Sequence, residues 1–429
     1  MIIACANLIA PILSLQLERA AFRFLIDARE NNEEQSEILS TVFTTLIVPI
    51  LLIITIVPIA RLMFGLNYWP YIMLILITSI LSNVALQIPR GLGKNLHFSI
   101  GSMIVGIVNA LTSIVALVIF HKGIEWVLIG NIISHLAGFI YIFFAMKLYK
   151  KVNISKKKTK TLKEMLKFSI PMIPNDISYW IINISDRMLI FIFLGDSFNG
   201  IYAAATKIPT FIVTAYNVFN MSWMETVSAH VHDKDASEFI SGTANMILRL
   251  FASICLSAMS ILPFIFNILV GNDFAEAYDY IPVLLIGAFF NIFIGMLSSV
   301  YIGYKKTKEI AKTTIAAAIL NLTINFVLIK TIGIWAAVIS TVFAYMFTSL
   351  YRLYDINKSV KIKIRPELLC LLTILLIVGA IFYIKGGMLL NIICLIFAIL
   401  TTLLFNLNAL KTVFRNVYKL KKGKYERKA

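Results

Sequence analysis

Apolar residues occur along the chain in long blocks, and a short polar stretch separates each block from the next. The blocks are about twenty residues or longer, the length a helix needs at about 1.5 Å per residue to cross a hydrocarbon layer of about 30 Å. Backbone groups in lipid must bond within their own segment, and barrel strands are only about half as long. The pattern predicts an all-α polytopic membrane protein with thirteen spans, at 1–27, 38–64, 69–89, 98–120, 125–146, 168–194, 200–228, 239–269, 280–303, 311–329, 332–351, 367–384 and 388–410.

Composition agrees with this class, because 59% of the residues are hydrophobic and only 14% are charged. Soluble domains are roughly half apolar and about a quarter charged. No loop between the predicted spans is longer than the segment 147–167, which leaves no room for a catalytic domain, and no GxxxxGK[ST] phosphate loop occurs. The chain is therefore not expected to be an enzyme.

The net charge of +17 is distributed unevenly along the chain. Nine lysines lie in 147–167 and eight Lys and Arg residues lie in 411–429, whereas the loops of opposite predicted orientation hold only Lys122, Lys330 and Lys385. This is the positive-inside bias, so the basic loops and the C-terminus are expected in the cytoplasm. Topology and attraction to anionic lipid account for the charge better than nucleic-acid binding does.

An internal repeat with a period of about 200 residues indicates two related halves. One match joins "RGLGKNLHFSIGSMIVGIVNA" (90–110) with "YIGYKKTKEIAKTTIAAAILNL" (301–322). Each of the four matches is weak alone, but all four occur in the same order. We expect two six-helix lobes related by a pseudo-two-fold axis along the membrane normal, with a central cleft open alternately to each side. The predicted parts are an N-terminal lobe (1–149), a basic linker (150–167), a C-terminal lobe (168–355), two additional helices (356–410) and a basic tail (411–429).

The predicted span 168–194 opens the second lobe and has no counterpart in the first. We therefore expect that the first helix of lobe one is missing from this chain. The missing helix would also explain why thirteen spans with a cytoplasmic C-terminus place Met1 outside.

Ionisable residues inside spans are costly and by default face a cavity or a partner. Helical spacing places several on common faces, and their cations suit a phosphorylated anion, because Arg matches phosphate oxygens with a planar fork. An exporter of lipophilic cations would instead favour acids and aromatic cages. The predicted substrate-binding residues are Arg19, Arg23, Asn183, Arg187, Lys207 and Arg249, and the candidates for ion coupling are Asp176, Asp186 and Glu225.

Structural alternatives stay open for four of these positions. Arg23 lies near a helix end and Lys207 has a long stem, so both can reach the interface. Asp186 and Arg187 can form ion pairs that only fix helix packing. The four cysteines are isolated and the five histidines are scattered, so we expect no disulfide, metal site or cofactor apart from a coupling H⁺ or Na⁺.

The segment "LKFSIPMIPNDISYWIINISDRMLIFIFLGDSFNGIYAAATKIPTFIVTAYNVFNMSWMETV" (166–227) resembles the opening of the second lobe in Wzx-type polysaccharide flippases. The segment 302–355 resembles later helices of that lobe, and the likeness extends from the first span to about residue 360. The superfamily also contains multidrug exporters and lipid II flippases, and its members usually have fourteen spans.

The resemblance implies a flippase that moves an undecaprenyl-diphosphate-linked oligosaccharide from the cytoplasmic to the outer leaflet of a bacterial plasma membrane. A polysaccharide polymerase and glycosyltransferases are the further partners it implies. The alternatives are a lipid II flippase or cation-coupled multidrug exporter of the same fold, and a membrane scaffold that transports nothing.

Overall fold

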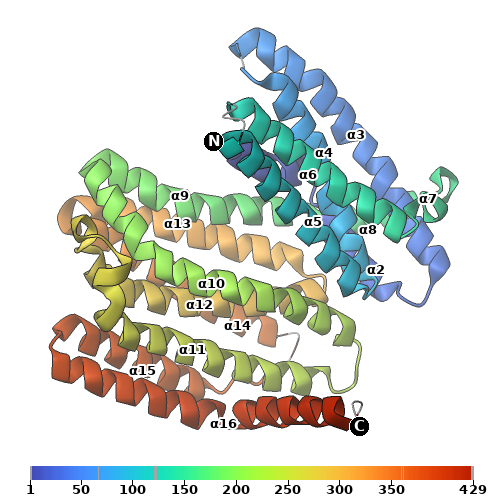
Figure 1. Ribbon diagram of the computed structural model, residues 1–429. Helices are drawn as coiled ribbons and strands as arrows, with labels where there is room; N and C mark the ends of the chain where they lie inside the picture. The colour runs from blue at the N-terminus through green and yellow to red at the C-terminus, as the bar shows by residue number, and fades with distance from the viewer. Residues whose placement is uncertain (1, 66, 120–122, 359, 361, 427–429) are drawn as a thin grey trace. The chain divides into compact units, whose positions relative to one another are not determined.

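The computed structural model describes residues 2–65, 67–119, 123–358, 360 and 362–426, and within this part the chain is helical without strands. The all-α prediction is confirmed (Figure 1). The first half contains α1 (Ile2–Leu13), α2 (Leu17–Asp27), α3 (Asn32–Phe64), α4 (Trp69–Gly91), α5 (Asn95–Ile114) with a π-helical turn (Val115–Ile119), α6 (Ile124–Ala145), α7 (Leu148–Lys151), a 3₁₀ turn (Ile154–Lys156) and α8 (Thr159–Ser169). The second half contains α9 (Met172–Leu194), α10 (Asp196–His230), α11 (Ala236–Leu269), a 3₁₀ turn (Asn272–Phe274), α12 (Ala277–Gly303), α13 (Thr307–Ile332), α14 (Ile334–Asn357), α15 (Pro366–Lys385) and α16 (Met388–Glu426).

Eleven of the described helical segments are long and apolar enough to cross a membrane. The two predicted spans outside this set are 1–27 and 200–228. The first is not one helix, because α1 ends at Leu13 and α2 begins at Leu17, with Leu15 and Gln16 in the left-handed region at φ 54° and 56°. The second belongs to α10, a single helix of 35 residues with many polar side chains. Residue 120, the predicted end of one span, and residues 427–429 of the tail lie outside the described residues.

The chain divides into two compact units. The first contains residues 1–177 and 301–312, and the second contains 178–300 and 313–429. The helices α9, α12 and α13 therefore each contribute to both units. The short segment 301–312, which joins α12 to α13, belongs to the first unit although it lies far from the rest of that unit in sequence.

Small residues allow close helix packing within the first unit. A Cβ atom at Gly138 of α6 would lie 2.4 Å from Val105 Cγ2 of α5, and one at Gly91 of α4 would lie 2.7 Å from Leu25 Cβ of α2. Real Cβ contacts are never so short. Glycine at these positions is thus what lets α6 and α4 approach their neighbours, as small residues do in membrane helix packing.

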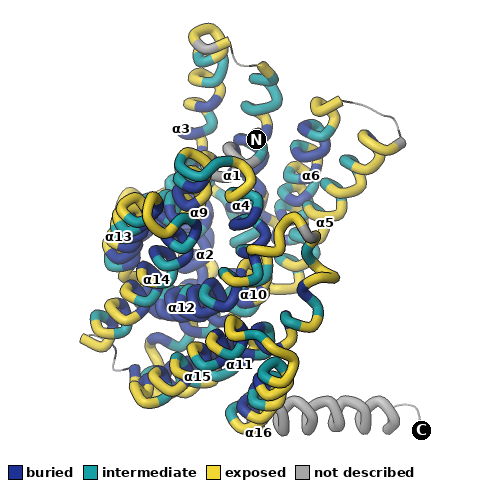
Figure 2. Tube along the Cα trace, turned by 90° about the vertical axis from the view of Figure 1, so that its left-hand side faces the viewer, coloured by how far each residue is buried: buried dark blue, intermediate teal, exposed yellow. Residues whose placement is uncertain are grey.

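Glycine also allows close helix packing in the second unit, since a Cβ atom at Gly379 of α15 would lie 2.5 Å from Leu256 Cδ1 of α11. The helix α12 is the most buried of the candidate spans, with 72% of its most apolar window inside the protein, whereas the segment Asn95–Val118 has only 11%. Figure 2 shows this contrast between the mostly buried α12 and the wide exposed faces of α5, α15 and α16. Exposed apolar faces on such long helices are the surfaces expected to meet lipid.

Candidate functional site

The break between α1 and α2 brings polar side chains of the first unit onto one carboxylate. Asp176, in the first turns of α9, accepts hydrogen bonds from Gln16 Nε2 and Arg19 Nη2, both at 2.8 Å from its Oδ2 atom. The side chains of Arg19 and Asp176 remain 39% and 29% exposed, so the ion pair is open to solvent. Asn175 Nδ2 donates to the other oxygen of Asp176 at 3.0 Å. Two predicted site residues, Arg19 and Asp176, therefore contact each other.

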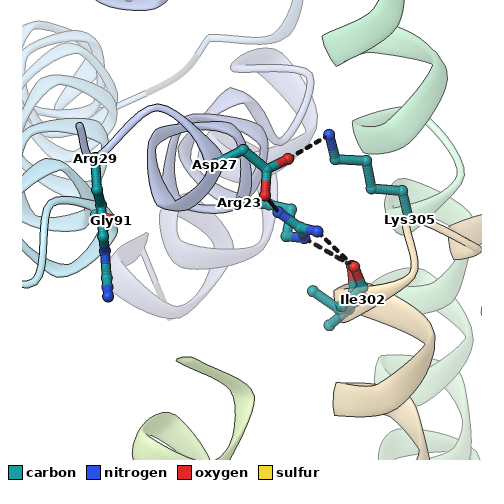
Figure 3. Close-up of polar contacts among 7 residues, drawn as sticks. Arg23, Asp27, Arg29, Gly91, Ile302 and Lys305 are labelled. Atoms are coloured by element: carbon teal, nitrogen blue, oxygen red, sulfur yellow. Dashed lines mark hydrogen bonds and ion pairs between the residues drawn. The ribbon is translucent and has the colours of Figure 1, made fainter. Parts of the chain in front are cut away.

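Arg23 lies one helical turn further along α2 but points elsewhere (Figure 3). Its side chain is 1% exposed, and it donates to Gly303 O from Nη2 at 2.6 Å and from Nε at 3.1 Å. Its Nη1 atom is 2.5 Å from Asp27 Oδ1, and Asp27 also pairs with Lys305 Nζ at 2.7 Å. The guanidinium thus binds the carbonyl end of α12, where cations are favoured. This arrangement differs from the prediction that Arg23 faces an aqueous cleft, because burial and protein partners leave it closed in this structure.

Asp186 lies in the second unit, on α9, and is 2% exposed. Its carboxylate accepts hydrogen bonds from Tyr202 Oη at 2.9 Å, Asn325 Nδ2 at 2.7 Å and Thr341 Oγ1 at 2.7 Å. These donors come from α10, α13 and α14, and all three are neutral. Asp186 is therefore the acceptor at the centre of a buried cluster of neutral donors, rather than a member of an ion pair within the described part of the chain.

The cluster also includes neutral residues, which were not predicted from the sequence because that prediction started from ionisable positions within the spans. Asn321 Nδ2 donates to Ser340 Oγ at 3.2 Å and to Thr341 Oγ1 at 3.1 Å. Asn325 Oδ1 is buried and has no hydrogen-bond partner in the described part of the chain. Asn321 and Asn325 are spaced i, i+4 on α13, so a search for amides on one face of a span would have found them.

Two cations of the second unit are more open than Arg23. Arg187 and Asn183 lie one turn apart on α9 and are exposed, and Lys207 on α10 is exposed as well. Neither Arg187 nor Lys207 has a hydrogen-bond or ion-pair partner among the residues that the structure describes. Arg187 is therefore available to a ligand in this structure, and so is Lys207.

The remaining predicted residues are partly buried. Arg249 Nε donates to Asn245 O, one turn earlier on α11, at 3.2 Å, and Asn245 Nδ2 donates to Lys363 O at 3.0 Å. Glu225 on α10 is also partly buried. No group of three His, Cys, Asp or Glu residues able to hold a metal occurs within the described ranges.

Within the second unit, Asp186 accepts hydrogen bonds from three protein donors, whereas Arg187 and Lys207 have no protein partner among the described residues. A surface with open cations and occupied acids can bind an anion with little rearrangement, because the anion has no protein carboxylate to displace.

The family model described as polysaccharide biosynthesis protein matches residues 1–229, which is more than half of the chain. The chain belongs to this family. No curated protein matches the chain significantly in sequence.

Solved structures confirm the fold at low sequence identity. The chain is similar to a MATE transporter in complex with MaD3S (TM-score 0.72, 13% identity, 83% of this chain and 86% of that one). It is also similar to an outward-facing multidrug resistance MATE family transporter of the MOP superfamily (TM-score 0.71, 13% identity, 84% and 87%). A third match is a MOP superfamily transporter from Pyrococcus furiosus, whose binding pocket has a reverse polarity that suggests a different function for that protein (TM-score 0.67, 14% identity, 82% and 86%). Family and fold together identify a multi-pass membrane transporter of the flippase type.

Proposed function

We propose that this family member flips an undecaprenyl-diphosphate-linked oligosaccharide from the cytoplasmic to the outer leaflet of a bacterial plasma membrane. The observation that carries the proposal is a pair of exposed cations, Arg187 and Lys207, on two successive helices of the second unit, neither of which has a partner among the residues that the structure describes. A cation in a membrane span is costly unless it faces water or an anion. A diphosphate supplies the anion, and each charge-assisted hydrogen bond to it contributes about 1.5–3 kcal/mol.

Arg19, taken within the first unit alone, is a further proposed substrate-binding residue. Its guanidinium donates to Asp176 and remains partly exposed, so it has further N–H groups for phosphate or sugar oxygens. Arg249 and Asn183 complete the proposed binding set. Arg23 joins it only in a conformation in which its bonds to α12 are released, because those bonds occupy it here.

Asp186 is the proposed site of ion coupling. Its carboxylate is buried among neutral hydroxyl and amide groups. Binding of H⁺ or Na⁺ to it would change the charge of the cluster and the hydrogen bonds that Tyr202, Asn325 and Thr341 donate to the carboxylate. Such a change biases one conformation over another, as a coupling ion must. Asp176 and Glu225 are the alternative positions.

The test of the substrate is flipping in proteoliposomes that contain undecaprenyl-diphosphate-linked hexosamine with a fluorescent label. An impermeant reductant bleaches the label in the outer leaflet, so the bleached fraction reports transbilayer movement. We expect R187Q/K207Q to slow flipping at least tenfold, since two charge-assisted contacts are lost. The matched control is K385Q, which removes an exposed lysine from the end of α15. Equal rates for the double variant and the wild type would refute the assignment.

The test of coupling applies a proton gradient or a Na⁺ gradient to the same vesicles. We expect D186N to abolish the dependence on whichever gradient drives the wild type, while D176N keeps it. The alternative function, a cation-coupled multidrug exporter, predicts transport of a lipophilic dye such as ethidium by the wild type and no flipping of the labelled lipid.

A further inference from the structure

The helix α10 is unusual among the long helices of the second unit. It has 35 residues, yet it is not among the eleven segments apolar enough to span a membrane. The reason is a stripe of polar residues at i, +3, +7 and +10, all of them exposed: Lys207, Thr210, Thr214 and Asn217. Four polar side chains on one lipid-facing stripe would be costly, so this face is expected to line water.

Contacts on the opposite face fix how α10 is rotated about its axis. Tyr216 is 1% exposed and lies against Gly295 of α12, where a Cβ atom would come within 2.8 Å of its ring. Trp223 is 3% exposed and donates from Nε1 to Met296 O at 3.2 Å. Asn220 Oδ1 accepts hydrogen bonds from Tyr216 and from Ser299 of α12. These anchors hold the polar stripe on the side of α10 that points away from α12.

An aromatic side chain lies within this stripe. Phe211 is 75% exposed, and helical spacing places Lys207 one turn before it and Thr214 one turn after it. The contrast is Phe264 of α11, which is 44% exposed but has Ile261 and Ile268 at the neighbouring turns, both exposed. Phe264 thus belongs to an apolar surface suited to lipid, whereas Phe211 has polar neighbours on one side, Lys207 and Thr214, and the exposed Ala215 and Val218 on the other.

We propose that Phe211 is the platform on which a sugar ring of the substrate packs, with Thr210, Thr214 and Asn217 binding its hydroxyl groups. Sugars combine an apolar C–H face with a rim of hydroxyls, and an exposed aromatic ring bordered by hydroxyl and amide groups matches both features. The Thr214 hydroxyl donates to Thr210 O at 2.8 Å, so its lone pairs can accept from a sugar hydroxyl. Lys207, one turn away, places a cation beside the sugar for the linked phosphate. The proposal rests on the proposed function and names the part of the site that binds the glycan.

The test compares two lipids on the full chain in nanodiscs: undecaprenyl diphosphate, and undecaprenyl diphosphate carrying a single N-acetylglucosamine. We expect the wild type to bind the sugar-bearing lipid more tightly. F211A should lose about five- to tenfold affinity for that lipid and keep its affinity for bare undecaprenyl diphosphate. F211W should retain the sugar preference because it keeps an aromatic face, and F264A, the matched control, should leave both affinities unchanged.

The outcomes separate the two proposals. If F211A weakens both lipids equally, or neither, the sugar platform is refuted while the diphosphate assignment stands. If the wild type binds neither lipid, the proposed function fails and the sugar platform fails with it. A thermal unfolding curve of F211A that matches that of F264A shows that any loss of binding does not arise from misfolding.

Discussion

Replacing Arg23 by Ala tests whether this residue holds the end of α12 in the first unit. The guanidinium is 1% exposed and donates to Gly303 O at 2.6 and 3.1 Å and to Ile302 O at 3.3 Å. Alanine leaves these carbonyl groups without their donor, and a buried unsatisfied group costs about 1–3 kcal/mol. Asp27 keeps its ion pair with Lys305, so its carboxylate adds little to the loss. We expect R23A to lower the free energy of unfolding by about 2–5 kcal/mol.

The measurement is thermal unfolding in detergent, with Arg29 as the matched control. Arg29 follows α2 and also donates to backbone carbonyls, to Gly91 O at 2.8 Å and Arg90 O at 3.2 Å, but it is only partly buried. R29A should therefore cost about 1 kcal/mol, a typical net value for a hydrogen bond. R23K should recover less than half of the loss, because an ammonium group lacks the planar fork that spans several acceptors. A Tm for R23A equal to that of R29A would refute the claim that Arg23 anchors α12.

Three further predictions follow from particular contacts. Gly295→Ala places a Cβ atom 2.8 Å from the Tyr216 ring, and this overpacking should lower the free energy of unfolding by about 1–3 kcal/mol. In a double-mutant cycle followed by Tm, the variant with both Gly295→Ala and Tyr216→Ala should be no less stable than the variant with Tyr216→Ala alone. Arg352 is 0% exposed and its guanidinium donates to Thr313, Thr314 and Ser298. R352K should therefore lower the Tm clearly, because an ammonium group cannot donate to all three hydroxyls with the same planar geometry. An unchanged Tm would show that these three hydrogen bonds do not stabilise the protein. Lys158 pairs with Glu37 at 2.5 Å, and this hydrogen bond raises the pKa of Lys158 above the ordinary value of 10.5. The pair therefore stabilises the folded protein fully below pH 10.5, and this stabilisation is lost as the pH rises through the raised pKa of Lys158. The Tm difference between wild type and E37Q should stay constant from pH 7 to 9 and shrink above pH 10.5. A change of that difference below pH 9 would contradict the assignment of the effect to Lys158.

Hydropathy alone located most spans, because a helix that crosses lipid must be apolar over its whole length. It did not reveal the break between α1 and α2, since residues 14–16 include neither glycine nor proline, the usual signals for such a break. Gln16 adopts φ 56° while its amide binds Asp176, 160 residues away. A contact over that distance cannot be inferred from local sequence.

Helical spacing predicted which polar residues share a face, but not what each face contacts. Asn183, Arg187 and Lys207 are exposed, and their predicted position in a cleft stays a prediction. Asp186 lies three residues after Asn183, a spacing that puts both on one side of the helix, yet it is buried, because three neutral donors from other helices surround it. An amphipathic pattern separates polar from apolar positions, and a polar residue satisfies it equally well in water or in a buried polar cluster.

The position of residues 301–312 in the first unit has a consequence for synthesis. Arg23 emerges early from the ribosome, but its carbonyl partners on α12 lie 279 and 280 residues further along. A chain that folds as it is made, N-terminal part first, must therefore hold this arginine without its carbonyl acceptors, with Asp27 as its local partner, until most of the protein has been inserted. The first unit is the first to be translated and among the last to be completed, so a nascent chain arrested before residue 301 should expose Arg23 to chemical modification, whereas one arrested well beyond residue 312 should protect it.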